Sequence, residues 1–318
     1  MAIDAGHLRR AVSMPALMPA PLFALAFDHR SSLRRDFLGL DGPATVADEE
    51  LCGRLKGVAL DGLLAAVDTG LPCGRTALLI DEEYGADTIE RARTAGVAVI
   101  VPVEVSGREE LTFVHGDDGF GAAIERVDPA YAKVLVRYDP HDGEVNDRQR
   151  ARLANLQDWL DAHARDWMLE LLVPMPAAIR GTGTKRRADW DRSTRPGVTS
   201  RAISELVDAG LRPTFWKLEG MPSTAMYEAV ADATNADRHG SACLVLGRGA
   251  DAAAVERWLR LAAPVPTYQG FAIGRSIWWD PLRALVEGTA TALQATRAIA
   301  DTYRHFVDVY LEATHADT

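Results

Sequence analysis

Short apolar runs of strand length alternate with longer amphipathic stretches along the chain. Eight runs are rich in Val, Ile, Leu or aromatic residues, and they occupy residues 22–27, 76–81, 97–103, 132–138, 168–174, 214–220, 242–247 and 269–274. Near-continuous apolar runs are typical of parallel strands that are covered on both faces. The pattern therefore predicts a parallel sheet with helices packed around it.

The amphipathic stretches between these runs predict the helices. Helices are expected over residues 48–68, 146–166, 200–210 and 251–263, with a shorter one over 87–96. Leu153 and Leu156 belong to an apolar stripe at helical spacing. Gly210 stands where a glycine commonly ends a helix. The segment from 281 to about 313 predicts one or two further helices.

The order of these elements predicts the fold class. Eight strands that alternate with helices indicate a single-domain α/β fold, the (β/α)8 TIM barrel. An open doubly wound sheet is the alternative, but the count of eight and the length of 318 residues favour the barrel. We expect an N-terminal extension over residues 1–21, the barrel over 22–285 and a helical extension over 286–318. The last packs either on the barrel or on a second copy in a homo-oligomer.

Composition narrows the class of protein. The net charge of −10 argues against a nucleic-acid partner, because phosphate binding needs basic surface. Three cysteines match no zinc or redox spacing, so we expect a cytoplasmic protein without a metal site. Prolines interrupt the apolar N-terminal stretch, and no other run approaches the ~20 residues of a membrane span. Neither a cleaved signal peptide nor a membrane partner is expected.

Charged and polar side chains gather where the apolar runs end. The carboxyl ends of barrel strands meet at one mouth, so we expect these side chains to converge on an active site there. The set comprises Asp28, His29, Arg30, Asp81, Glu82, Glu83, Glu104, Arg137, Asp139, His141, Lys217, Glu219, Arg248 and Arg275. Among them, Arg137 and Asp81 are candidate substrate-binding residues.

Two glycine–arginine turns close the last two runs. The first contains Arg248 and Gly249, and the second contains Arg275 and Ser276. Loops at this point of a barrel commonly form a phosphate site, where glycines let backbone N–H groups approach and a guanidinium grips two oxygens. The alternative is two tight turns with exposed arginines. We favour a phosphate site.

Two lysines lie inside apolar runs, where an unpaired charge is costly. Lys133 lies in the fourth run, and Lys217 lies in the sixth. Each either pairs with a carboxylate such as Glu170 or Glu219, or one of them is a nucleophilic amine whose pKa is lowered by burial and by a neighbouring cation. The residues alone leave these two interpretations open.

Several motifs recur in an order that resembles a known family. They are LAFDHR (25–30), LLIDEEYG (78–85), AKVLVRYDP (132–140), MLELLVP (168–174), WKLEG (216–220), CLVLGRG (243–249) and GFAIGRSIWWDPL (270–282). The set resembles the aldolase-like domain at the C-terminus of the inositol-catabolism kinase, 5-dehydro-2-deoxygluconokinase. That domain is similar to class I tagatose-bisphosphate and sulfofructose-phosphate aldolases. The resemblance covers about residues 22–285, without the kinase domain, so the substrate here can differ.

The resemblance implies a class I aldolase that needs no cofactor and acts on a phosphorylated small molecule. Lys217 matches the Schiff-base lysine, Glu170 matches the strand-five carboxylate, and Asp28 matches the acid after the first strand. In this interpretation Lys133 lowers the pKa of Lys217, and the two turn arginines grip phosphate. The implied substrate is 2-deoxy-5-keto-gluconate 6-phosphate, which gives dihydroxyacetone phosphate and malonate semialdehyde; tagatose-bisphosphate or sulfofructose-phosphate chemistry is the alternative.

Two rival functions stay open at this point. A metal-dependent aldolase would use His29, His115 or His141, although no paired-histidine motif supports it. A non-catalytic barrel that binds sugar phosphates is the other rival, because fold does not fix function. The basic segment 181–198 is either a lid over an anionic substrate or a solvated loop, and we favour the loop.

Overall fold

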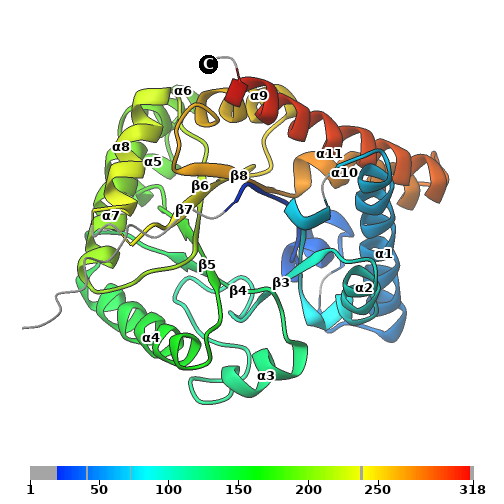
Figure 1. Cartoon of the computed structure of the whole chain (residues 1–318), viewed down its shortest axis with the longest axis horizontal. Coiled ribbons are helices and arrows are strands. Elements are labelled where there is room, and N and C mark those ends of the chain that lie inside the picture. Colours follow the sequence, from blue (N-terminus) through cyan, green and yellow to red (C-terminus); the bar gives the residue numbers. More distant parts are fainter. Residues whose placement is uncertain (1–19, 41, 72, 237–238, 316–318) are drawn as a thin grey trace, which may run out of the picture.

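The protein is a closed barrel of eight parallel strands in sequence order, with helices around it (Figure 1). The computed structural model describes residues 20–40, 42–71, 73–236 and 239–315. The strands are β1 (Leu22–Phe27), β2 (Thr76–Ile80), β3 (Ala98–Pro102), β4 (Tyr131–Arg137), β5 (Trp167–Leu172), β6 (Phe215–Glu219), β7 (Ala242–Leu246) and β8 (Tyr268–Ile273). Pairing of β1 with β8 closes the ring. The predicted (β/α)8 barrel is confirmed, and all eight predicted strands are present.

Helices connect the strands and form the outer layer. They are α1 (Val46–Asp68), α2 (Glu82–Thr94), α3 (Phe120–Val127), α4 (Gly143–Ala162), α5 (Ala177–Arg180), α6 (Thr184–Ser193), α7 (Arg195–Asp208), α8 (Thr224–Thr234), α9 (Ala252–Ala262), α10 (Arg275–Val286) and α11 (Ala292–His315), with short turns η1 (Leu33–Phe37) and η2 (Cys73–Arg75). Helices α3, α5 and α8 were not predicted from the sequence. Within the described residues, no helix is both long and apolar enough to cross a membrane.

Local signals place several helix starts. Thr45 and Asp48 form a capping box at α1, in which each side chain accepts the other's backbone N–H. Asp81 caps α2 by accepting a hydrogen bond from the Tyr84 N–H. The C-terminal segment forms two helices, but the first begins at Arg275, ahead of the expected start at Pro281, which lies inside α10.

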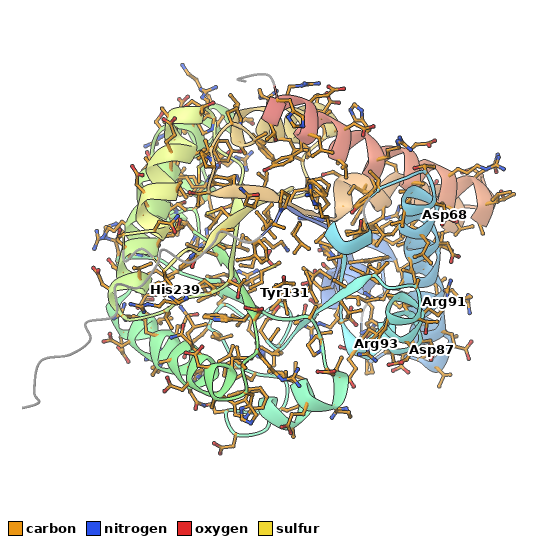
Figure 2. The ribbon with its side chains drawn as sticks, in the orientation of Figure 1. Asp68, Asp87, Arg91, Arg93, Tyr131 and His239 are labelled. Carbon is orange, nitrogen blue, oxygen red and sulfur yellow. The ribbon has the colours of Figure 1, made fainter. Side chains whose placement is uncertain are left out.

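Alternation along the strands divides the core into two parts. Outward side chains such as Trp216 and Leu218 pack beneath the helices, and Figure 2 shows side chains filling this ring. Inward side chains form a smaller core, which includes Phe215 and Leu244; Tyr131 packs against it near the centre of the barrel (Figure 2). Lys217 is flanked by two outward residues, so its amine points into the barrel.

The helical extension packs on the barrel. Helix α11 lies against α1, α9 and α10 (Figure 1). The Tyr303 hydroxyl donates to the Phe23 carbonyl at 2.7 Å, and the Tyr310 hydroxyl donates to the Tyr268 carbonyl at 2.5 Å. These contacts reach β1 and β8, so α11 covers the seam where the ring closes. The expected extension over residues 1–21 lies almost wholly outside the described residues.

Candidate active site

Four predicted residues come together in the barrel interior, although only two of them are register partners; the register partner of Lys133 on β5 is Met168. Glu170 on β5 is the register partner of Lys217 on β6. Lys133 on β4 points inward next to them, and Asp28 directly follows β1. Below this level the interior is apolar, and above it the strands end. The charged side chains therefore lie at the carboxyl mouth, where barrel enzymes hold their active sites.

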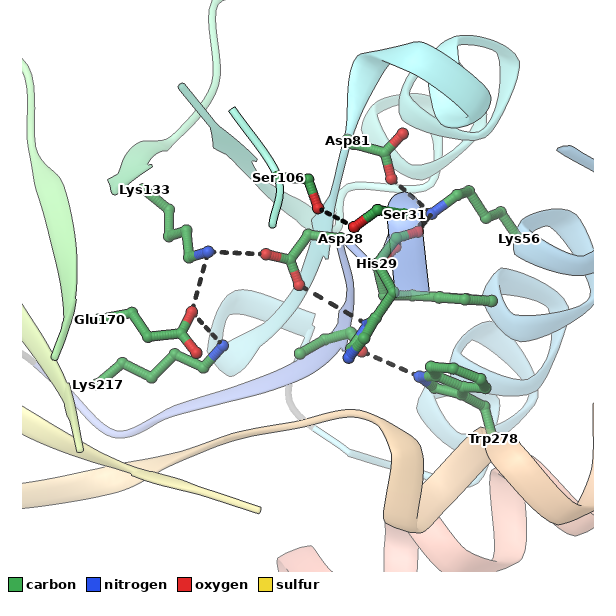
Figure 3. Close-up of polar contacts among 12 residues, drawn as sticks. Asp28, His29, Ser31, Lys56, Asp81, Ser106, Lys133, Glu170, Lys217 and Trp278 are labelled. Atoms are coloured by element: carbon green, nitrogen blue, oxygen red, sulfur yellow. Dashed lines mark hydrogen bonds and ion pairs between the residues drawn. The ribbon is translucent and has the colours of Figure 1, made fainter. Parts of the chain in front are cut away.

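A buried network joins these residues (Figure 3). Lys133 Nζ lies 2.9 Å from Asp28 Oδ2, 2.7 Å from Glu104 Oε1 and 2.9 Å from Glu170 Oε2. Lys217 Nζ lies 2.9 Å from the same Glu170 oxygen. Lys133 is 1% exposed and Lys217 is 4% exposed. Two amines therefore share one carboxylate oxygen in a site with little access to bulk water.

The charges of the network decide which groups are ionised. Burial opposes the charge on Lys133, but Asp28, Glu104 and Glu170 outweigh it and raise the lysine pKa well above 10.5. Burial likewise opposes ionisation of Asp28 and Glu170. The ammonium groups of Lys133 and Lys217 outweigh burial there and lower both carboxyl pKa values. Lys133 is therefore a fixed cation, and its two lowered partners are carboxylates.

Glu104 behaves differently from the other acids. Burial raises its pKa despite the neighbouring Lys133 ammonium. Its Oε2 atom is buried and has no hydrogen-bond partner within the described part of the chain. Glu104 thus holds its proton to higher pH than a free glutamate does. The sequence pattern predicts Glu104 as a strand-end acid but does not predict it as a catalytic or binding residue; its position directly after an apolar run is the signal that marks it.

A cavity of about 320 Å³ opens onto this network. Its walls include Asp28, Glu104, Lys133, Glu170 and Lys217, together with Arg137 and Arg275. A larger cavity of about 500 Å³ lies between β3 and α3, but apolar side chains dominate its walls and neither Lys133 nor Lys217 reaches it. We place the candidate active site in the smaller cavity, because the amines and acids converge there.

The three histidines considered as metal ligands separate in the structure. His29 lines the active-site cavity, His115 lines the apolar cavity, and His141 lines neither. Burial lowers the pKa of His29 to about 4, although Asp28 opposes this, so its imidazole is neutral at physiological pH. Across the described ranges, no group of three or more His, Cys, Asp or Glu side chains is arranged to hold a metal ion.

Of the two glycine–arginine turns predicted to bind phosphate, only the second, which contains Arg275, contributes an arginine to the walls of the active-site cavity. Arg275 lines the cavity, and its guanidinium rests against Gly249, where a Cβ would come within 2.7 Å of the arginine Cζ. The Ser276 hydroxyl donates to the Ala250 carbonyl at 2.6 Å, which ties the start of α10 to the same loop. Arg137 also lines the cavity and donates to the Arg108 carbonyl.

Arg248 and Asp81 are placed differently from the expectation. Arg248 pairs with Asp191 at 2.6 Å and with Glu219 at 2.9 Å, so two carboxylates already neutralise it, and it is absent from the cavity walls. Asp81 is 1% exposed and pairs with Lys56 on α1. The sequence shows that each residue ends a strand, but it does not show which loop or helix supplies the partner charge.

The basic segment is largely helical rather than a solvated loop, which corrects our expectation. It forms α6 and the start of α7. Arg195 is 1% exposed; it pairs with Asp191 at 2.6 Å and donates to the Gly220 carbonyl at 2.6 Å. Trp190 is also buried. The apolar anchor and the ion pairs hold the segment against the barrel, while Lys185 and its neighbours stay exposed.

The fold and the site define a TIM barrel with a buried lysine–carboxylate cluster at its mouth. The chain belongs to the family described as "uncharacterized protein conserved in bacteria" (DUF2090), whose model matches residues 5–314. No curated protein matches the sequence.

Solved structures with a similar fold include two fructose-bisphosphate aldolases. The Plasmodium falciparum enzyme, in complex with TRAP and a small-molecule inhibitor, aligns with a TM-score of 0.62 and 14% identity over 92% of each chain. The Slackia heliotrinireducens enzyme aligns with a TM-score of 0.52 and 15% identity over 88% of this chain and 86% of that one. A Corynebacterium glutamicum protein aligns with a TM-score of 0.54 and 18% identity over 90% of this chain and 85% of that one. At these identities the likeness shows the fold alone.

Proposed function

We propose that this protein is an aldolase that cleaves a phosphorylated keto sugar or keto sugar acid through a Schiff base on Lys217. The observation that carries the proposal is the shared carboxylate. Glu170 bonds one lysine that is held as a permanent cation and a second lysine that faces the same cavity. Such an arrangement suits a nucleophilic amine with an adjacent proton acceptor.

Formation of the Schiff base uses Lys217 and Glu170. Glu170 accepts a hydrogen bond from the amine at 2.9 Å, so it is placed to take the proton that Lys217 must lose before attack. The amine then adds to the substrate ketone to give a carbinolamine. Glu170 returns the proton to the departing hydroxyl, water leaves, and an iminium ion forms. Lys133 remains charged beside the oxygen that develops negative charge.

Bond cleavage uses Asp28 as the base. Because the two lysines hold it ionised, Asp28 can accept the proton of the hydroxyl beyond the scissile bond. The carbon–carbon electrons move into the iminium, which leaves an enamine and releases an aldehyde. A carboxyl with a lowered pKa gives up its proton readily, so Asp28 returns that proton to the enamine carbon. Hydrolysis of the new iminium frees the ketone product.

The substrate phosphate is assigned to Arg275 and the start of α10. A helix N-terminus offers free backbone N–H groups and a positive dipole end to an anion. Arg137 lies in the same cavity and would meet the other end of the substrate. The specific substrate 2-deoxy-5-keto-gluconate 6-phosphate rests on the sequence resemblance. Cys52 and Cys243 are free and buried, which fits the cytoplasm as the site of the reaction.

The proposal is tested by trapping the iminium. The protein is incubated with dihydroxyacetone phosphate, reduced with sodium borohydride, and analysed by intact mass and peptide mapping. We expect one covalent adduct on Lys217 and none in Lys217→Ala. An adduct on Lys133 instead would mean that the wrong amine was assigned. Cleavage activity that is sensitive to EDTA and gives no adduct would favour a metal-dependent enzyme. Binding without adduct or turnover would favour a non-catalytic barrel.

A further inference from the structure

A second buried ion pair lies behind the segment that carries Asp28. Lys56 projects from the middle of α1 and is 0% exposed, and its Nζ lies 2.5 Å from Asp81 Oδ2 (Figure 3). A fully buried lysine–aspartate pair is unusual, because apolar residues of similar volume would fill such a site without the cost of desolvating two charges. The pair therefore calls for an explanation beyond packing.

The hydrogen bonds that Lys56 makes besides the one to Asp81 explain why the ion pair is there. An ammonium group has three donors. Lys56 Nζ donates to Asp81, to the Phe27 carbonyl at 2.5 Å and to the His29 carbonyl at 3.3 Å. These two carbonyls stand on either side of Asp28. Lys56 thus binds the backbone before and after the residue that contacts Lys133.

Asp81 fixes the other end of this connection. Its Oδ1 atom accepts a hydrogen bond from the Tyr84 N–H and caps α2, while Oδ2 bonds Lys56. The pair therefore joins α1, α2 and the end of β1 at one point. Packing leaves little freedom there, because a Cβ on Gly85 would come within 2.5 Å of Ile80 and 3.6 Å of Lys56 Cδ.

We propose that Lys56, held by Asp81, is a positioning residue that fixes the backbone on both sides of Asp28 and so aims its carboxylate at Lys133 and the substrate. This inference rests on the proposed aldolase function. An uncharged pair fills the same space and caps the same helix, but it cannot bind both carbonyls. An uncharged pair at these positions therefore tests whether Lys56 positions the backbone around Asp28 or only fills space.

The test uses the double variant Lys56→Met/Asp81→Asn in the full-length protein. It removes both charges together, so no unpaired buried ion remains, and Asn retains the cap on α2. The probe is dihydroxyacetone phosphate, whose Schiff base allows two measurements. Borohydride trapping reports Lys217, and solvent deuterium entering the enamine carbon, followed by NMR, reports proton transfer by Asp28.

We expect the double variant to keep near-normal thermal stability and a normal adduct on Lys217. Its maximal rate of deuterium exchange should fall by about 10²-fold, because a misplacement of about 1 Å has that effect, with little change in the concentration of half-saturation. In an Asp28→Asn background the same two substitutions should cause no further loss, since residues that act as a unit are not additive. Replacing the exposed pair Arg91→Met/Asp61→Asn, which also joins α1 to α2, is the matched control and should leave exchange unchanged.

A crystal structure of the double variant gives a readout that does not depend on activity. We expect the distance between Asp28 Oδ2 and Lys133 Nζ to lengthen beyond the present 2.9 Å. An unmoved Asp28, a wild-type exchange rate, or a loss that simply adds to that of Asp28→Asn would overturn the positioning role. Absence of any adduct in the wild type would instead overturn the proposed function, and the crystal structure would still decide the role of Lys56.

Discussion

Lys133 determines the protonation of the acids in the active-site cavity. Its ammonium lies within 3 Å of three carboxyl groups, and it holds Asp28 and Glu170 ionised. The Lys133 ammonium also favours the charged form of Glu104, but burial has the larger effect there, so the pKa of Glu104 is raised rather than lowered. Three chemically similar acids around one amine thus have two different protonation tendencies.

Substitution of the two glutamates should reveal this difference. Gln resembles a protonated carboxyl, so Glu104→Gln should change the rate of Schiff-base formation little. Glu170→Gln should slow it by about 10²-fold or more, because the group that accepts the Lys217 proton is lost. Stopped-flow mixing with dihydroxyacetone phosphate, followed by borohydride quench and mass analysis, measures both rates. Equal effects of the two variants would contradict the assignment.

Removal of the central cation should weaken the fold in a pH-dependent manner. Lys133→Met leaves the carboxylates buried without their partner, and we expect a loss of about 3–5 kcal/mol at neutral pH. In the wild type, the lowered pKa values of Asp28 and Glu170 stabilise the fold at any pH above the ordinary carboxyl pKa values of 3.8 for Asp28 and 4.5 for Glu170. That contribution is lost as the pH falls and the carboxyls gain protons. Urea unfolding of both proteins from neutral pH to about pH 2 should therefore show a difference that shrinks as the pH falls below these ordinary values; a difference that stays constant down to about pH 2 would contradict the account.

At the residue scale, the presence of charged residues within apolar runs was the most informative property of the sequence. It indicated that Lys133 and Lys217 need a role or a partner such as Glu170 or Glu219, and the structure brings both lysines together with Glu170. It did not indicate that Lys56 is buried, because a lysine in the middle of an amphipathic helix usually covers the surface. Nor did it indicate that Arg248 is already paired, since its partner Asp191 comes from a distant helix.

At the scale of elements, α6 depends on a few charged contacts. The segment contains exposed Lys185, Arg186 and Arg187, and its last turn is held by Asp191, which pairs with Arg195 and Arg248. A helix with so few apolar anchors is expected to open more readily than the barrel. The lid interpretation of this segment stays a prediction.

Trypsin cleavage of α6 tests this dependence. Asp191→Ala removes charge-assisted hydrogen bonds to both arginines, and cleavage within α6 should become at least about tenfold faster. Asp189→Ala is the matched control, because Asp189 pairs only with exposed Arg192 one turn away within the described residues. Cleavage sites and rates are read by mass spectrometry. Equal rates in the two variants would show that α6 is held by other contacts.

Element boundaries were less predictable than element identity. The short α3 ends at Asp128, a non-glycine residue in the left-handed region with a φ of 48°, so it lacks the usual glycine signal. In α10 the reverse occurs, because Pro281 indicated a helix start but lies in the interior. Packing of Ile277 and Trp278 into the core fixes the earlier start, and tertiary contacts thereby override the local preference.

At the scale of the whole molecule, α11 completes the barrel from outside. Two of its tyrosines bond carbonyls of β1 and β8, the two strands that meet at the seam. Eight apolar runs in regular alternation were sufficient to predict the ring. The side on which the final helix would pack was not predictable, because its apolar stripe would suit a second subunit equally well.

A single hydroxyl in this helix should contribute measurably to stability. Tyr303→Phe removes the bond to the Phe23 carbonyl and should cost about 1 kcal/mol. Thr302→Ala is the control, because its hydroxyl donates only within the helix and is exposed. Urea unfolding followed by circular dichroism compares the two variants with the wild type. An equal effect in both would show that the cross-seam bond contributes nothing specific.

The same bond constrains the order of events during protein synthesis. Tyr303 lies 280 residues after Phe23, so at ribosomal rates β1 emerges roughly 15 to 60 s before its covering helix exists. For most of that interval one edge of β1 has no strand beside it, because β8 (Tyr268–Ile273) is made only shortly before α11. The nascent chain therefore presents an open strand edge for most of translation, and premature termination anywhere before α11 should yield aggregation-prone fragments rather than smaller working barrels.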